Sequence, residues 1–176
     1  MKNYKLGTTG DRILTVKKRG PDYFVMIRMK DDDKKSIELS PHRWASFRQY
    51  IDDITSNVKA VTAGEEDIKL CQHIGGGHYV SVTSGYRCVD FRRWFQPYGP
   101  KDGEIKPTKN GVALRFEEWF DLCTLVDAIN TAYPSLGTAL PCYYKEDHIN
   151  PPFWLSCAEC HPFHDHLSQM SSVKST

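Results

Sequence analysis

The sequence predicts an α+β protein built from two tandem modules, each a four-stranded antiparallel sheet followed by a helix, with a small Cys/His-rich segment at the C-terminus. Two observations predict the modules: an internal repeat, and alternating strand patterns ahead of each copy of it. A third, the crowding of Cys and His near the end of the chain, predicts the extra segment. The expected bounds are 1–63, 72–136 and 137–176.

The repeat is visible by direct comparison. Residues 36–44 (SIELSPHRW) are similar to residues 111–119 (GVALRFEEW), at an offset of 75 residues. After each tryptophan, apolar residues recur at steps of three and four, which is the pattern of one helix face. The two stripes are Trp44, Phe47, Ile51, Ile54 and Val58, and Trp119, Leu122, Val126, Ile129 and Tyr133. The same stripe twice, each time after a similar strand, indicates a duplication.

Local signals set the expected helix ends. Ser40 is a typical N-cap, and the proline that follows it suits the first helical position. Glu117 and Glu118 suit the positive end of the second helix, and Pro134 should end it. The first helix is expected to fray near residues 63–64.

Strand patterns precede each helix. Residues 12–16 and 79–82 alternate, and 23–29 and 88–94 are expected to pair with them across turns at 20–22 and 83–85. The second copy has an insertion, 96–110, where the first has only 31–35. One sheet with one helix is too small to cover both faces, so we expect the helices to be buried against each other or against a partner.

Positive charge is concentrated on the strands. The chain carries a net charge of only +1, but residues 1–39 hold ten Lys/Arg against six Asp/Glu, and residues 71–115 hold seven against three. The second helix, 116–136, holds four acids and no base. Basic strands interleaved with aromatic residues suit single-stranded nucleic acid, because phosphates pair with cations and bases stack on rings. The alternative is a solvated basic face. The candidates are Lys17, Lys18, Arg19, Tyr23, Arg28, Tyr86, Arg87, Arg92, Arg93, Trp94, Lys106 and Lys109.

The second copy resembles the DNA-binding domain of the transcriptional coactivator family called positive cofactor 4. The similar stretches are residues 79–82 (YVSV), 89–95 (VDFRRWF) and 103–112 (GEIKPTKNGV), followed by the tryptophan and the helix. The first copy matches best over residues 36–58. The resemblance implies a curved sheet plus helix that dimerises, binds single-stranded or melted DNA in basic channels, and catalyses nothing.

The resemblance also assigns residues. Arg92 matches a DNA-contacting arginine of the family, Phe95 matches its tryptophan, and Lys106 and Lys109 match basic loop positions. Tyr86 lies near the family's stacking phenylalanine. There are also departures. Asn110 replaces the last loop lysine, and residues 75–77 (GGG) replace a Lys/Arg pair expected before the first strand. The first copy lacks the basic loop and carries residues 31–33 (DDD), so the second copy should bind DNA more strongly.

The family forms dimers, and this chain carries two copies. We therefore expect an intramolecular pseudo-dimer joined by the linker 62–72, because effective concentration favours pairing within a chain whose linker can span the gap. The alternative is a homodimer. The partners expected are single-stranded or melted DNA and proteins of transcription or replication, with no membrane. The nucleus is the expected location, or the cytoplasm for a chain of prokaryotic or viral origin.

The C-terminal segment has the residue types of a zinc site. Cys157 and Cys160 form a Cys-x-x-Cys pair, with His164 close behind and Cys142 as a further ligand. His148 is the alternative fourth ligand. A structural zinc ion would help to fold a segment with little core of its own. A loosely ordered tail is the alternative. Residues 157–161 (CAECH) also fit a c-type haem attachment pattern, which is not expected without an export signal.

Secretion, catalysis, protein interaction and RNA binding are the other functions that the sequence bears on. The chain start leads into no apolar run, so we expect no signal peptide and reduced cysteines. No acid/base pair, nucleophile constellation or phosphate loop stands out, so an enzyme is not expected. The main alternative to DNA binding is a protein-interaction scaffold that keeps the fold. RNA binding is a third possibility, because stacking and phosphate contacts alone do not separate RNA from DNA.

Overall fold

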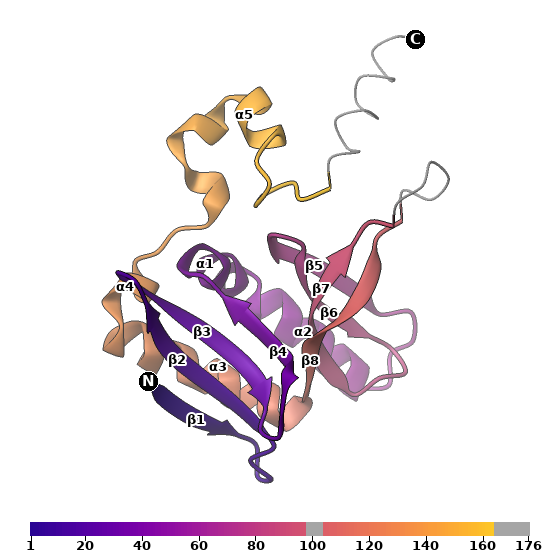
Figure 1. The fold of residues 1–176 in the computed structure, drawn as a ribbon. Helices are drawn as coiled ribbons and strands as arrows, with labels where there is room; N and C mark the ends of the chain where they lie inside the picture. Colours follow the sequence, from indigo (N-terminus) through magenta and orange to yellow (C-terminus); the bar gives the residue numbers. More distant parts are fainter. Residues whose placement is uncertain (98–103, 164–176) are drawn as a thin grey trace.

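Two four-stranded antiparallel sheets form the framework of the protein. The computed structural model describes residues 1–97 and 104–163. The strand orders are β1-β2-β3-β4 and β5-β6-β7-β8 (Figure 1). The first sheet consists of β1 Lys2–Leu6, β2 Arg12–Arg19, β3 Asp22–Met29 and β4 Asp32–Leu39. The second consists of β5 Lys69–Gly75, β6 His78–Thr83, β7 Cys88–Phe95 and β8 Lys106–Arg115. The predicted α+β class, with two successive sheet-plus-helix units, is confirmed.

Helices follow each sheet. They are α1 Pro41–Gln49 and α2 Ile51–Thr62 after the first, and α3 Phe116–Ala132 and α4 Pro134–Gly137 after the second. Ser40 caps α1 by accepting a hydrogen bond from the Arg43 N–H at 3.4 Å, as its residue type predicts. At α3 the side chain of Glu118 accepts from the Arg115 N–H at 2.8 Å, which is one half of a capping box. The C-terminal segment adds η1 Cys142–Tyr144, η2 Glu146–Ile149 and α5 Pro151–Leu155.

Three boundaries differ from the sequence prediction. Strand β8 begins at Lys106, inside the expected insertion 96–110, so Lys106 and Lys109 lie on a strand and not in a loop. The first helix is broken at Tyr50, whose backbone (φ −105°, ψ 2°) leaves the α-helical region and whose N–H bonds to Phe47 three residues back. The second sheet begins at Lys69, ahead of the expected start at residue 72. As a result, residues 75–77 form the β5–β6 hairpin turn and do not precede the first strand of the module.

A single apolar core joins both halves of the chain. Buried residues of both sheets and of α1, α2 and α3 form one continuous cluster. Phe47 lies at its centre, where its ring centroid is 5.5 Å from those of Trp44 and Phe91 and 5.8 Å from that of Trp119. Phe91 and Trp119 belong to the second repeat. The helical stripes read from the sequence are therefore buried against the other half of the chain, as well as against their own sheets.

Two hydrogen bonds connect the halves reciprocally. The indole Nε1 of Trp44 donates to Asn130 Oδ1 at 2.9 Å, and the indole Nε1 of Trp119 donates to Thr55 Oγ1 at 3.2 Å. Trp44 and Trp119 differ by the repeat offset of 75, and so do Thr55 and Asn130. An interface in which residue i of one copy meets residue j of the other, and the reverse, is typical of a two-fold symmetric pair.

The sheets and helices of the two halves also lie against each other. Strands β4 and β8 lie side by side where the sheets meet (Figure 1). Helix α1 packs against β5 of the second sheet, and α3 packs against β1 of the first. Among the described residues, no helix combines the length and the apolar composition that crossing a membrane requires.

Candidate nucleic-acid interface and metal centre

A groove runs between the two sheets along β4 and β8. Its volume is about 770 Å³. Two aspartates, Asp32 and Asp33, line it. The described residues also contribute five cationic side chains: Arg12, Lys34, Lys35, Arg92 and Lys109. The side chains of Lys34 and Lys109 come from opposite walls, one from each sheet, and both residues are exposed. The groove therefore collects positive charge from both halves of the chain.

Both arginines that line the groove, Arg92 and Arg12, form hydrogen bonds within the protein. Arg92 makes two 3.0 Å contacts with Asp90, through Nε and Nη2, and donates to the Thr108 carbonyl oxygen at 2.9 Å. Arg12 reaches across from β2 and donates to the Ala113 carbonyl oxygen of β8 at 3.1 Å. Lys34 and Lys109 supply the more available charge, because Lys35 Nζ lies 4.0 Å from Asp32 Oδ2. The ion pair with Asp90 leaves Arg92 less available to a ligand.

A row of rings lies on the same face of the second sheet as Arg92. The centroids of His73 and Tyr79 are 4.9 Å apart, and those of Tyr79 and Trp94 are 5.8 Å apart. Tyr79 is the cross-strand neighbour of Arg92. Burial lowers the pKa of His73 to about 4, so its ring is neutral at pH 7. Rings beside cations are the surface on which single-stranded bases stack.

The structure separates the other predicted residues of the second copy. Tyr86 and Arg87 lie at the β6–β7 turn, where Tyr86 is 67% exposed. Phe95 pairs with Lys106 in the β7–β8 register, at the end of the hairpin. Arg93 pairs with His78, on the opposite strand face from Arg92. Of the four basic candidates on β7 and β8, Arg92 and Lys109 line the groove, whereas Arg93 and Lys106 do not.

The first copy divides its predicted residues between two faces. Strand alternation places Lys17, Arg19 and Arg28 on the face away from the helices. All three are paired: Lys17 and Arg19 with Glu38, at 2.7 and 2.5 Å, and Arg28 with Asp33 at 3.4 Å. Lys18 and Tyr23 lie on the helix side, where the Tyr23 ring packs 4.8 Å from that of Tyr133.

The first copy contributes two lysines to the groove that its sequence pattern did not predict. Lys34 and Lys35 follow the aspartates at 31–33, a run expected to repel phosphate, and they were not among the candidates. The β3–β4 hairpin places them along the edge of β4, facing β8. The signal available in the sequence was the pair of adjacent lysines at the start of the last strand before the repeat tryptophan.

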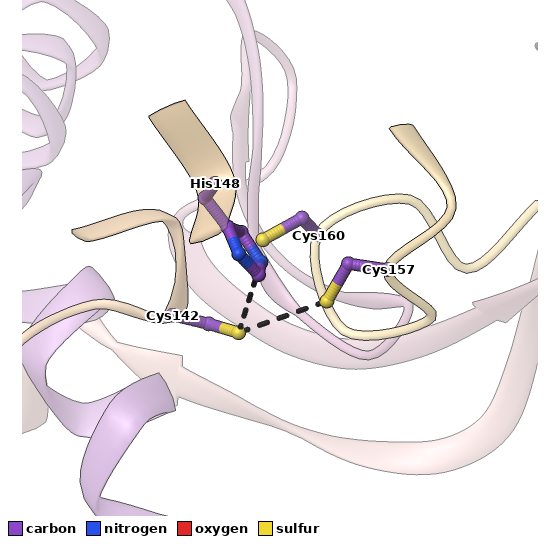
Figure 2. A group of neighbouring side chains, drawn as sticks. All are labelled: Cys142, His148, Cys157 and Cys160. Atoms are coloured by element: carbon purple, nitrogen blue, oxygen red, sulfur yellow. Dashed lines mark hydrogen bonds between the residues drawn. The ribbon is translucent and has the colours of Figure 1, made fainter. Parts of the chain in front are cut away.

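Four side chains of the C-terminal segment converge on one point. The ligand atoms of Cys142, His148, Cys157 and Cys160 all lie within 4.8 Å of one another (Figure 2). The Cys142 sulfur is 3.8 Å from the Cys157 sulfur and 3.8 Å from His148 Nε2. These four residues could hold a metal ion, and His148 takes the place that was expected for His164. His164 lies outside the described residues.

The surroundings of the cluster suit metal ligands. His148 Nδ1 bonds to Asp147 Oδ1 at 2.7 Å, which leaves Nε2 directed at the sulfurs (Figure 2). A carboxylate behind a histidine ligand is a common second layer of metal sites. Burial and the neighbouring thiols raise the pKa of Cys142 and of Cys160. Burial also raises the pKa of the Cys157 thiol, but hydrogen bonds from the Cys160 backbone, the His148 side chain and the Glu159 backbone outweigh it and lower the pKa to about 7. Deprotonated sulfur is the form that binds metals.

Comparison with known proteins adds no family assignment: a scan against protein-family models found no match, and a search of curated proteins found no significant match.

Proposed function

We propose that this chain binds single-stranded or melted DNA in the groove between β4 and β8, and that it acts in transcription regulation or replication, in the nucleus or, for a prokaryotic or viral chain, in the cytoplasm. The carrying observation is the groove itself, which gathers cations from both sheets. One of them, Arg92, is the cross-strand neighbour of Tyr79, whose ring packs against that of Trp94. Lysines attract the phosphates, and Tyr79 and Trp94 offer ring faces for bases. The positive cofactor 4 resemblance of the second copy points to the same ligand.

We further propose that the two modules, about 1–63 and 72–136, form a pseudo-dimer within one chain. The reciprocal bonds of Trp44 and Trp119 and the shared core around Phe47 support this arrangement. Light scattering should therefore give a monomer of about the chain mass, 20.2 kDa. A dimer or tetramer at micromolar concentration would instead favour pairing between chains.

The DNA proposal predicts salt-dependent binding that depends on the groove lysines. In fluorescence anisotropy with a labelled single strand, changing both Lys34 and Lys109 to alanine should flatten the slope of log affinity against log salt by about 1.4, or ~0.7 per lost phosphate contact on a single strand. Lys59→Ala is the matched control, because Lys59 is exposed on α2 and does not line the groove. Duplex DNA and RNA competitors establish the preferred ligand.

Absence of binding at low salt would contradict the DNA proposal. It would favour the second candidate, a protein-interaction scaffold. The specific observation for this candidate is the Arg92–Asp90 ion pair, which neutralises the arginine that resembles the family's DNA contact. If Lys59→Ala weakened binding as much as the Lys34/Lys109 variant does, positive charge in general, and not the groove, would be what attracts the strand.

We propose Zn²⁺ as the ion of the C-terminal cluster, in a structural role. The three thiols and one imidazole are a typical structural zinc set, and a tetrahedral ion with Zn–S bonds of ~2.3 Å separates its sulfurs by about 3.8 Å. The Cys142–Cys157 distance has this value. Purified protein should carry about one zinc per chain by elemental analysis. A metal-free protein that takes up no zinc on titration would refute the site.

A further inference from the structure

The turn between the metal-site cysteines reaches back to the main body of the protein. Glu159 lies between Cys157 and Cys160, and its carboxylate accepts hydrogen bonds from Arg43 Nε at 2.7 Å and Nη2 at 2.9 Å. Its carbonyl oxygen accepts a hydrogen bond from the Gly76 N–H at 2.8 Å. Arg43 belongs to α1 of the first module, and Gly76 to the β5–β6 turn of the second. One residue of the metal-site turn therefore contacts both modules.

The β5–β6 turn is shaped for this contact. Gly75, Gly76 and Gly77 all have positive φ, at +124°, +58° and +81°. A Cβ on Gly75 would lie 2.4 Å from Glu159 Oε1, and one on Gly76 would lie 2.3 Å from Arg43 Nη2. Only glycine satisfies both the backbone conformation and the close approach. The triple glycine, which departs from the family pattern, thus has a physical role in seating Glu159 and Arg43.

In the other half of the molecule, the corresponding hairpin turn contacts the corresponding helix directly, without a residue of the described part of the C-terminal segment. There the β1–β2 turn packs on the start of α3: the Gly7 N–H donates to Asp121 at 2.7 Å, and Arg12 lies 3.8 Å from the buried Glu118. At the repeat offset of 75, Glu118 corresponds to Arg43. The first helix therefore carries a base where the second carries an acid. In the described structure, the acid opposite Arg43 comes from Glu159 of the C-terminal segment.

The C-terminal segment has little apolar packing with which to hold Glu159 in place. Within residues 142–163, Ile149 and Phe153 are exposed, Trp154 is 38% exposed, and the one residue in the buried core is the ligand Cys142. The four candidate ligands bring η1, η2 and the Cys157–Cys160 turn together, with their ligand atoms within 4.8 Å of one another; the Trp154 ring adds one further contact, 4.4 Å from that of His161. The position of Glu159 thus depends on the same turn that the ion would fix.

We propose that the metal site acts as a brace between the two modules: the bound ion fixes the 157–160 turn, and Glu159 then joins Arg43 of α1 to the β5–β6 hairpin. This inference rests on the proposed zinc site. The brace completes, for the second hairpin, the contact that the first hairpin makes through Arg12 and Glu118. It also supports the ring row, because the carbonyl oxygen of Gly77 accepts from the Trp94 N–H at 2.8 Å.

The test is Glu159→Gln in the full chain, with zinc content and hydrogen exchange of the Gly76 amide measured together. In the unmodified protein, removing zinc with a chelator should speed Gly76 exchange by about tenfold or more, the loss expected for a charge-assisted contact. In Glu159→Gln, zinc content should stay at the unmodified level, while exchange is fast with or without zinc. Glu146→Gln is the matched control, an exposed acid in the same segment.

Several outcomes would overturn the brace. In one, the Glu159→Gln variant keeps slow, zinc-dependent exchange at the Gly76 amide. This would mean that the contact does not depend on the Glu159 carboxylate and that the proposed brace is absent. Another is loss of zinc from Glu159→Gln, which would make Glu159 part of the metal site itself. A zinc-free unmodified protein would refute the zinc proposal, and with it the brace. The zinc content of the unmodified protein distinguishes failure of the zinc proposal from failure of the brace alone.

Discussion

Phe47→Ala is expected to lower the free energy of unfolding by about 3–5 kcal/mol, the range for removing a fully buried phenylalanine. Phe47 is completely buried, and its ring contacts Trp44 of its own repeat and Phe91 and Trp119 of the other. The cavity would therefore open where the two halves meet. Urea unfolding followed by circular dichroism and by tryptophan fluorescence measures the loss, and both signals should give one common transition.

The control is Phe120→Ala on α3, because the Phe120 side chain is 40% exposed. Its effect should stay within about 1 kcal/mol. If Phe47→Ala cost no more than this control, or if the transition split in two, the halves would be independent domains. That result would refute the shared core as the basis of the proposed pseudo-dimer.

Cys157→Ser is expected to weaken zinc binding by more than about 100-fold, because losing even an outer-layer partner of a metal ligand costs roughly 10–100-fold. Serine keeps the size of the side chain but replaces a thiolate with a hydroxyl that does not ionise at neutral pH. Competition with a coloured chelator measures the affinity. Limited proteolysis should cut the variant within residues 142–163, since the ion is proposed to order a segment with little core of its own.

Cys71→Ser is the matched control, because Cys71 is an exposed free thiol on β5, outside the cluster. It should bind zinc as the unmodified chain does. Equal zinc affinity in Cys157→Ser and Cys71→Ser would exclude Cys157 as a ligand and would contradict the four-residue site.

The inner strands of both sheets and the helix faces could be predicted because their patterns are local, whereas the edge strand β1 was not identified. The stripes after Trp44 and Trp119 specify the helix faces, and Ser40 specifies a helix start. The break at Tyr50 could not be predicted, since neither Gly nor Pro stands at this position or next to it. The start of β5 at Lys69 was missed because the mainly polar residues 69–73 lack the apolar alternation that identified other strands.

The candidate sites were predictable to different degrees. Cys142, Cys157 and Cys160 were found because close spacing of cysteines is itself a metal signal, and His148 had been left as the alternative fourth ligand. The groove depends on two strands far apart in the sequence, so Lys34 gave no local sign of meeting Lys109. The pairing of Arg43 with Glu159 spans 116 residues. Such contacts follow from tertiary packing, which a local pattern does not encode.

The reciprocal bonds of Trp44 and Trp119 have a consequence for the direction of a bound strand. A homodimer must repeat every contact identically, so its two-fold axis gives a nucleic-acid chain no preferred 5′-to-3′ orientation. Here both copies belong to one chain and have diverged: Arg43 stands where the other half has Glu118, and the ring row of Tyr79 and Trp94 belongs to the second sheet alone. A strand in the groove would meet two unlike walls. Because the two copies are joined in one chain and differ from each other, such a strand would have a preferred 5′-to-3′ direction.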